Sequence, residues 1–563
     1  MKTGKAVVQA LKQEEVKTIF GLPGAHILPV YDALYDEEEI QHILVRHEQA
    51  AGYMADGYAR STGKIGVCLL ASGPGVLNAV TAVTEAYLSS TPMVVLAGGP
   101  PIKLRGKGAI HEMNQLQVFQ PITKWQKILK NSQEVFDVIH KAFQIALLGR
   151  PRPVYVELPF DILIGETKLK NKERLDVYTG KISVKERDVE KVLSLLLKSN
   201  RPVILAGGGV VSANATNELA ELSETLQIPV VLTYMSRGAI PENSKLFLGT
   251  LPDKYSFYLI QQADLVLALG CKFSETTTAT FRLKIPNLVQ VDIDPEEIGK
   301  NYSVKLGLIG DIKAFLKSLV EKVKSLPRKN LLRREEWLRE VLKFKSERVL
   351  EYETEINSNK SPIKPQRLMK EIADIVTSET IVTCDSGYNT WWTNIFIKPS
   401  KPRKLLTPVG NWTMGFSFPA GIGAKIGNPE NPVVCICGEG GFMISCAELT
   451  TIVEYKIPVI IVVMNNGWFG AIRSYQKHIY NRRFIASKLQ NPCFAEIAKA
   501  FGVESFLIRK PEEIKDSLKT ALNLSKPTLL DVYLDPEEEI PTWFLETFYG
   551  KKGLNRRKAY KTH

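Results

Sequence analysis

The sequence has no long hydrophobic run and no leader-like start. Its longest apolar runs, such as residues 458–464, are far shorter than the ~18 residues that cross a bilayer. The first 20 residues alternate charged and apolar side chains without a continuous apolar core, so we expect no signal peptide. These absences predict a cytoplasmic protein with no membrane partner.

Paired cysteines and histidine clusters are also missing. The seven cysteines form no C-x-x-C motif, and the seven histidines form no H-E-x-x-H motif. Several cysteines lie in apolar runs, for example in residues 433–437. We therefore expect buried free thiols in a reducing compartment and no histidine-bound zinc.

The charge balance is basic, with 73 Lys and Arg against 60 Asp and Glu. Much of this excess is local, because residues 551–563 carry six Lys or Arg and no acid. No basic stripe interleaved with aromatic residues is present, so we expect no nucleic-acid partner.

Short apolar runs alternate with helical stretches along the chain. Such runs are typical of strands buried on both faces, which predicts parallel sheets covered by helices, the α/β class. Polar stretches at 165–188 and 325–365 divide the chain into domains of residues 1–165, 187–325 and 366–540, followed by a basic tail at 541–563. The predicted strands include residues 65–70, 93–97, 154–158, 203–206, 265–269, 288–293, 433–437 and 459–464.

The most informative segment is residues 432–473. A strand ends at Gly438-Glu439-Gly440-Gly441, and the strand at 459–464 leads into Asn465-Asn466-Gly467. In a right-handed βαβ unit both strand ends point the same way, which puts Glu439 and Asn466 at one ligand-binding edge. Oxygen side chains suit Mg²⁺, and glycines let backbone N–H groups approach a phosphate. The segment predicts a Mg²⁺–diphosphate site; the alternative is two turns that merely close the strands.

A helix is also predicted to begin at Ser445-Cys446-Ala447-Glu448, which has the S-x-x-E pattern of a capping box.

The N-terminal part supplies a second set of polar residues among Gly/Pro loops. Residues 21–26 (GLPGAH) follow a predicted strand at 18–20, Arg46-His47-Glu48 precedes a helical stretch, and residues 72–75 (SGPG) lead to Asn78. A carboxylate at this point either caps the helix or faces a site between the loops.

Together these segments resemble the thiamine-diphosphate (ThDP) enzymes of the acetohydroxyacid synthase and pyruvate oxidase branch. That family has a Gly-Asp-Gly motif followed about 27 residues later by a double Asn, and an Arg-His-Glu motif; the resemblance covers about residues 1–540. It implies three doubly wound parallel-sheet domains: pyrimidine-binding, central Rossmann-like and pyrophosphate-binding. It also implies a homodimer or homotetramer with active sites at the dimer interface.

The resemblance assigns roles by position. Glu48 would contact the aminopyrimidine of ThDP and promote the imino tautomer that removes the thiazolium proton. Mg²⁺ would be held by Glu439, the Asn466 side chain and the Trp468 carbonyl. Met414 would be the apolar wedge under the bent cofactor. The other expected cofactor-binding residues are Pro23, Gly24, Gly73, Asn78, Ser386, Gly387, Tyr388, Asn389, Gly438, Gly440, Gly441, Phe469 and Gly470.

The sequence departs from the biosynthetic synthases at several positions. Glu439 stands where Asp is usual, and Thr276 stands where an arginine would grip the acceptor carboxylate. The flavin-associated runs are replaced at residues 249–252 and 272–276, so we predict that FAD is not bound.

Two histidines point to proton transfer. Residues 23–26 resemble the Gly-Ala-His run of benzaldehyde lyase, and His111 lies in Ile110-His111-Glu112 where the synthases have a glutamine. We expect His26 and His111 to be catalytic, because a histidine suits proton transfer near neutral pH.

The favoured function is an acetolactate-synthase-like carboligase acting on pyruvate or another 2-oxo acid. One alternative is a 2-hydroxyacyl-CoA or benzaldehyde-type lyase, with an acyl-CoA or aldehyde substrate and the basic tail as a candidate contact for coenzyme A phosphates. The other is a non-catalytic subunit with the ThDP fold, which is suggested by Glu439 in place of the usual Asp in the metal motif.

Overall fold

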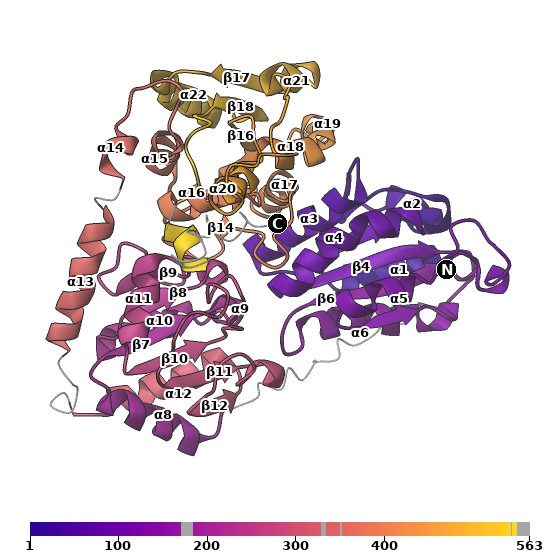
Figure 1. Cartoon of the computed structure of the whole chain (residues 1–563). Coiled ribbons are helices and arrows are strands. Elements are labelled where there is room, and N and C mark those ends of the chain that lie inside the picture. The colour runs from indigo at the N-terminus through magenta and orange to yellow at the C-terminus, as the bar shows by residue number, and fades with distance from the viewer. Residues whose placement is uncertain (170–183, 328–333, 350–351, 542, 549–563) are drawn as a thin grey trace, which may run out of the picture.

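The computed structural model describes residues 1–169, 184–327, 334–349, 352–541 and 543–548. Three six-stranded sheets organise this part of the chain, and their neighbouring strands pair in parallel. We call the three sheets with their helices the N-terminal, middle and C-terminal units. In Figure 1 the C-terminal unit lies above the other two, with the N-terminal unit on the right. The α/β prediction is confirmed.

The N-terminal unit is a doubly wound sheet. Helices cover both faces of the sheet, so alternate residues of β3(Gly66–Leu70) face two different apolar cores. Cys68 and Leu70 lie in one core, and Val67 and Leu69 lie in the other. Its strand order is β2(Gln41–Leu44), β1(Thr18–Gly21), β3(Gly66–Leu70), β4(Met93–Gly99), β6(Pro153–Pro159), β5(Gln126–Ile128). Its helices are α1(Thr3–Gln13), α2(Leu28–Tyr35), α3(Glu48–Thr62), α4(Pro74–Ser89), α5(Gln115–Phe119), α6(Val135–Leu147) and α7(Phe160–Leu163).

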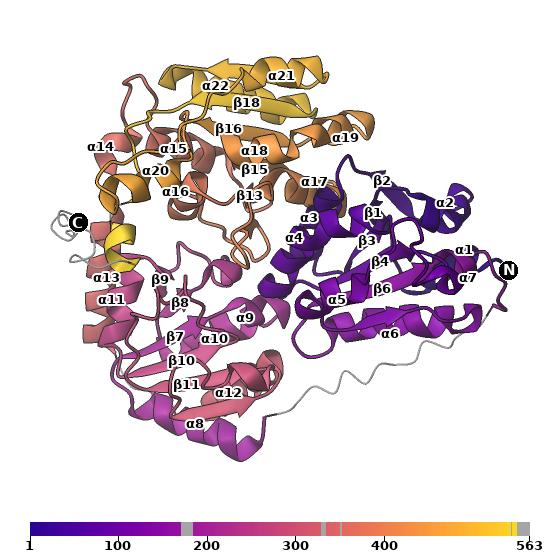
Figure 2. The same cartoon turned by 45° about the vertical axis from the view of Figure 1, so that its right-hand side comes forward.

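The middle unit repeats this plan. Its strand order is β12(Leu306–Ile309), β11(Leu288–Asp292), β10(Leu265–Leu269), β7(Pro202–Ala206), β8(Val230–Leu232), β9(Phe247–Thr250). Its helices are α8(Glu186–Lys198), α9(Gly208–Ser212), α10(Thr216–Leu226), α11(Lys254–Gln262) and α12(Ile312–Lys324). The connector helix α13(Glu335–Val349) then runs along the side of the molecule toward α14(Glu353–Ile356) and the C-terminal unit (Figures 1 and 2).

The C-terminal unit carries the sequence motif with Glu439. Its strand order is β14(Leu405–Leu406), β13(Ile381–Cys384), β15(Val433–Gly438), β16(Ile460–Asn465), β18(Thr528–Tyr533), β17(Glu504–Ile508). Its helices are α15(Pro365–Ile375), α16(Tyr388–Phe396), α17(Ser417–Gly427), α18(Glu439–Ser445), α19(Leu449–Glu454), α20(Gly470–His478), α21(Phe494–Ala500) and α22(Pro511–Leu524).

The N-terminal and C-terminal units share one apolar core, to which α3 and α17 contribute side by side. Glycines allow this approach: a Cβ on Gly57 would overlap the Ala420 carbonyl, and a Cβ on Gly423 would overlap the Met54 carbonyl. The packing places the start of α3, and with it Glu48, close to the C-terminal unit.

The structure confirms the predicted strands with ends shifted by at most two residues. The predicted capping box at Ser445 is wrong. A helix already begins at Glu439, and Ser445 bonds back to the carbonyls of Gly441 and Phe442 instead of capping a new helix.

The basic run 551–563 lies outside the described residues. Within the part that the structure describes, no helix combines the length and apolar character needed to cross a membrane.

Candidate active site

Four loops of the C-terminal unit meet at one edge of its sheet. They follow the carboxyl ends of β13, β14, β15 and β16, which are neighbours in the sheet. Ligands of open α/β sheets bind at this edge. The loops hold residues 385–389, 410–415, 438–441 and 466–470, which include all the cofactor-binding and metal-ligating residues predicted in this unit.

The predicted metal pair comes together there. Glu439 is 3% exposed, and its Oε1 accepts hydrogen bonds from the backbone N–H groups of Asn466 (2.9 Å), Gly467 (2.7 Å) and Trp468 (3.3 Å). The Asn466 Oδ1 accepts the Trp468 N–H at 3.0 Å. Burial raises the pKa of Glu439 to about 7. A nearby cation would favour the ionised carboxylate that burial disfavours.

Open space lies beside this pair. A Cβ on Gly467, whose φ is +75°, would meet no atom within 4 Å, and a Cβ on Gly438 would meet only Asn389 Oδ1 at 3.4 Å. The same oxygen is the only atom near a Cβ on Gly387, at 3.7 Å. Carboxylate and amide oxygens beside glycines with open space around them fit a Mg²⁺–diphosphate group.

Met414 lies against the glycine motif. A Cβ on Gly440 would stand 2.9 Å from the Met414 Cε and would overlap the Phe469 ring, while a Cβ on Gly470 would stand 2.9 Å from the Tyr388 Cβ. These glycines are therefore needed for close packing around the site. The predicted residues Met414, Gly440 and Phe469 form one contact group.

Glu48 is the first residue of α3 and is 6% exposed. Its Oε2 accepts a hydrogen bond from the Asn78 Nδ2 at 2.8 Å, and a Cβ on Gly75 would stand 2.8 Å from its Oε1. The helix cap is instead His47, whose Nδ1 accepts the Gln49 N–H at 3.2 Å. Glu48 is therefore held by its side-chain neighbours and is not used as a cap.

The two predicted histidines meet through a serine. The Ser72 Oγ lies 2.6 Å from His26 Nδ1 and 3.5 Å from His111 Nδ1, and the two imidazole rings are 5.8 Å apart. Burial first, and the nearby His111 second, lower the pKa of His26. Gly73 lets His111 approach, because a Cβ there would stand 2.8 Å from the His111 Cβ.

Pro23 and Gly24 lie in the loop before His26. Pro23 is exposed, and a Cβ on Gly24 would stand 2.5 Å from the Ala71 Cβ. The loop thus packs beside the segment that carries Ser72.

The hydrogen bonds described for Glu48 lie within the N-terminal unit, and those described for Glu439 lie within the C-terminal unit. No described bond joins the two carboxylates. The units are nevertheless linked beside both. The Glu448 Oε1 accepts the N–H groups of Arg46 (3.0 Å) and His47 (3.1 Å), and the Tyr53 hydroxyl donates to the Met414 carbonyl at 3.5 Å.

Three buried acidic residues around the site were not predicted from the sequence. Glu448 was assigned to a capping box, whereas it accepts bonds from the Arg-His-Glu segment. Asp385 follows β13 directly, and Glu85 is an acid within the apolar helix α4; both are fully buried. An acidic residue in an apolar stretch could have indicated these positions. Such groups are rarely buried without hydrogen-bond partners, so a buried acid predicts a partner elsewhere in the chain.

Comparison with known proteins agrees with this geometry. The chain matches the thiamine pyrophosphate enzyme family in three places: its N-terminal TPP binding domain at residues 1–118, its central domain at 189–319 and its C-terminal TPP binding domain at 385–532.

Full-length relatives point to one branch of that family. The chain is 39% identical over 558 residues to the probable acetolactate synthase large subunit of Methanocaldococcus jannaschii, covering 96% of this chain and 93% of the relative. It is 33% identical to the acetolactate synthase large subunit of Haemophilus influenzae, covering 95% and 94%. It is also 33% identical to the acetolactate synthase isozyme 3 large subunit of Escherichia coli, covering 95% of each chain. The chain therefore belongs to the thiamine pyrophosphate enzymes, in the branch of the acetolactate synthase large subunits.

Proposed function

We propose that this enzyme transfers the acyl unit of pyruvate, or of another 2-oxo acid, to a carbonyl acceptor, with ThDP and Mg²⁺ bound. The observation that carries the proposal is the meeting of Glu439 with the Asn466–Trp468 turn beside Met414. The full-length likeness to acetolactate synthase large subunits favours carboligation over the lyase and non-catalytic alternatives.

The diphosphate end would lie at the edge of the C-terminal sheet. Glu439, the Asn466 side chain and the Trp468 carbonyl would hold Mg²⁺, with Ser386, Gly387 and the glycines 438, 440 and 441 around the diphosphate. When bound, ThDP would supply the carbanion that makes and breaks C–C bonds next to a carbonyl. The protein's task is then to bind, orient and move protons.

Glu48 would exchange a proton with a ring nitrogen of the aminopyrimidine. The Asn78 amide fixes one carboxyl oxygen at the start of α3. His26 and His111 would move protons at the substrate carbonyl. The lowered pKa of His26 favours its neutral imidazole, which can accept a proton.

The proposed function is tested by incubating the purified protein with pyruvate, ThDP and Mg²⁺. We expect acetolactate to form only when both cofactors are present. Cleavage of an acyl-CoA or a benzoin-type substrate without turnover of 2-oxo acids would favour the lyase alternative. Failure to bind ThDP would favour the non-catalytic one.

A cavity of about 370 Å³ lies where the three units meet. Its glycines serve packing: a Cβ on Gly207 would overlap the Gly270 carbonyl, and one on Gly209 would stand 2.7 Å from the Gly270 Cα. Its cationic side chains already bond protein groups, namely Arg60 to Thr407, Arg150 to Glu297, Arg237 to Glu242, Lys272 to Leu88 and Arg403 to Val211.

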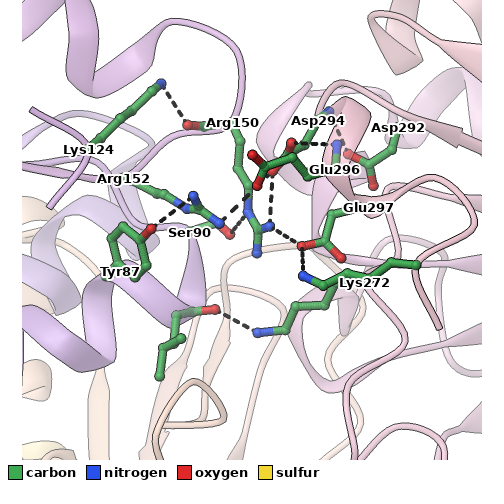
Figure 3. Close-up of polar contacts among 12 residues, drawn as sticks. Tyr87, Ser90, Lys124, Arg150, Arg152, Lys272, Asp292, Asp294, Glu296 and Glu297 are labelled. Atoms are coloured by element: carbon green, nitrogen blue, oxygen red, sulfur yellow. Dashed lines mark hydrogen bonds and ion pairs between the residues drawn. The ribbon is translucent and has the colours of Figure 1, made fainter. Parts of the chain in front are cut away.

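Figure 3 shows this pairing between two units. Arg150 of the N-terminal unit lies against Asp294 (3.3 Å) and Glu297 (2.7 Å) of the middle unit, and Lys272 donates to the Leu88 carbonyl at 2.7 Å. Cations with protein partners are less available to the diphosphate of a flavin dinucleotide. This pairing supports the proposal that the cavity does not hold FAD.

We therefore expect the purified protein to show no flavin absorbance. Its carboligase activity should be unchanged by added FAD, while omission of ThDP should abolish it. Flavin that copurifies with the protein, or activity that depends on FAD, would contradict this expectation.

We also propose a homo-oligomer, with each active site built by two chains. Exposed apolar side chains lie beside the site loops of both units, as a covering second copy requires. They are Leu28, Leu77, Ile110, Met443 and Ile444, which are 43–76% exposed. The proposed domain boundaries remain 1–165, 187–325 and 366–540.

Mixing two inactive variants tests this arrangement. In a hybrid dimer of Glu48→Gln and Asn466→Ala chains, one site would have both wild-type residues. A random one-to-one mixture should regain about a quarter of wild-type activity, since half the dimers are hybrids with one intact site of two. Each variant mixed with the double variant is the control and should stay inactive. No recovery after verified subunit exchange would contradict the shared site.

A further inference from the structure

The loop that carries Met414 is held by a buried acid of another unit. Glu85 of α4 is fully buried, and its carboxylate accepts hydrogen bonds from the backbone N–H groups of Gly410 (2.9 Å) and Asn411 (2.8 Å). The hydroxyls of Thr413 (3.4 Å) and Ser89 (2.6 Å) donate to it as well. A buried carboxyl group needs such hydrogen-bond partners.

The other two units hold the same loop. The Gly415 N–H donates to Asp385 of the C-terminal unit at 3.0 Å, and the Trp412 Nε1 donates to the Thr276 Oγ1 of the middle unit at 3.1 Å. The Trp412 ring stacks on Trp391, with ring centroids 5.8 Å apart. The loop is therefore a junction of three units.

The backbone of the loop is strained at this junction. Trp412 has a φ of +53°, a left-handed conformation that bulky side chains rarely adopt. Such a conformation persists only where the surroundings determine it, and strained residues gather at functional sites. Gly410 permits the close approach to α4, because a Cβ there would stand 2.7 Å from the Glu85 carbonyl oxygen.

We propose that Glu85 is a positioning residue, whose carboxylate fixes the loop 410–415 so that Met414 is presented to the cofactor. The inference rests on the proposed role of Met414. Glu85 acts from the N-terminal unit, on the same helix α4 as Asn78, the partner of Glu48. Because each site is proposed to be built by two chains, this helix would support Met414 of one site and Glu48 of the other.

Glu85→Gln tests this, with Ser89→Ala as the matched control. Glutamine keeps the size but offers one acceptor oxygen, and its NH₂ group would face N–H donors. Ser89→Ala removes a bond to the same carboxylate from the helix side and leaves the loop donors in place.

The first readout needs no cofactor. Backbone amide hydrogen exchange in a peptide spanning 410–415 should accelerate by about tenfold or more in Glu85→Gln, because bonds to a charged acceptor are lost. Exchange in β15 should stay at the wild-type rate, and Ser89→Ala should resemble wild type in both segments.

The second readout is the C2–H/D exchange rate of bound ThDP at saturating cofactor. We expect Glu85→Gln to slow it by about tenfold while the KM for pyruvate changes little, a split that general destabilisation does not produce. Glu85→Asp keeps the carboxyl group but shortens the side chain. It should also accelerate amide exchange in 410–415 and slow C2 exchange, and it replaces Glu85→Gln if that variant does not fold.

Met414→Ala separates this inference from the proposed function. Unchanged C2 exchange in Met414→Ala would refute the role proposed for Met414. Slowed exchange in Met414→Ala, together with wild-type loop protection and C2 exchange in folded Glu85 variants, would overturn the positioning role alone. If Glu85 acts only by positioning Met414, C2 exchange in the double variant Glu85→Gln/Met414→Ala should be no slower than in Met414→Ala.

Discussion

Glu48→Gln should leave ThDP binding nearly intact and slow C2–H/D exchange of the bound cofactor by at least about 10²-fold, the scale of lost general acid–base catalysis. Glutamine preserves the shape that packs against Gly75 and can still bond Asn78. It removes only the group that can exchange a proton with the aminopyrimidine.

The measurement pairs a ThDP titration with quenched-flow H/D exchange. Glu454→Gln is the matched control, because Glu454 is an exposed acid that pairs with Arg46 beside the same helix start. This control should exchange at the wild-type rate. An unchanged rate in Glu48→Gln would remove Glu48 from the mechanism.

Asn466→Ala and Glu439→Gln should weaken Mg²⁺ and ThDP binding together. Metal and diphosphate ligate one another, so loss of a protein ligand affects both. We expect a loss of at least about 10²-fold, since even the outer-shell partners of metal ligands are worth about 10–100-fold. Glu439→Gln keeps an oxygen that can accept the N–H groups of residues 466–468. This variant therefore tests whether the negative charge of Glu439 is needed for binding, while the turn at 466–468 keeps its hydrogen-bond acceptor.

Isothermal titration with Mg²⁺ and ThDP measures this loss, and thermal unfolding checks the fold. Asn465→Ala is the control, because the side chain of the neighbouring Asn465 donates to Asp531 of β18 at 2.9 Å. Glu439→Asp should keep or tighten binding if the site merely tolerates the longer acid. Wild-type affinity in Asn466→Ala and Glu439→Gln would show that the ligand assignment is wrong.

Much of this protein could be predicted from its sequence. The runs at 265–269 and 433–437 are continuously apolar because they are buried on both faces of a sheet, and they form β10 and most of β15. The spacing of Glu439 and Asn466 predicted a meeting at one sheet edge, because the intervening crossover of a parallel pair returns the chain to the same edge.

What the sequence determined by itself was local: strand positions, the fold class, and the glycine and acid motifs at strand ends. Only the tertiary structure decided which distant groups meet. Glu85 bonds the N–H groups of a loop 325 and 326 residues away, and Glu448 bonds those of Arg46 and His47 across a gap of 402 and 401 residues. No periodicity in the sequence predicts such pairings, because they depend on how the N-terminal and C-terminal units pack against each other. In this packing Glu448, which was predicted to lie in a capping box, and Glu85, a charged residue in an apolar helix, hold segments of the candidate site in place.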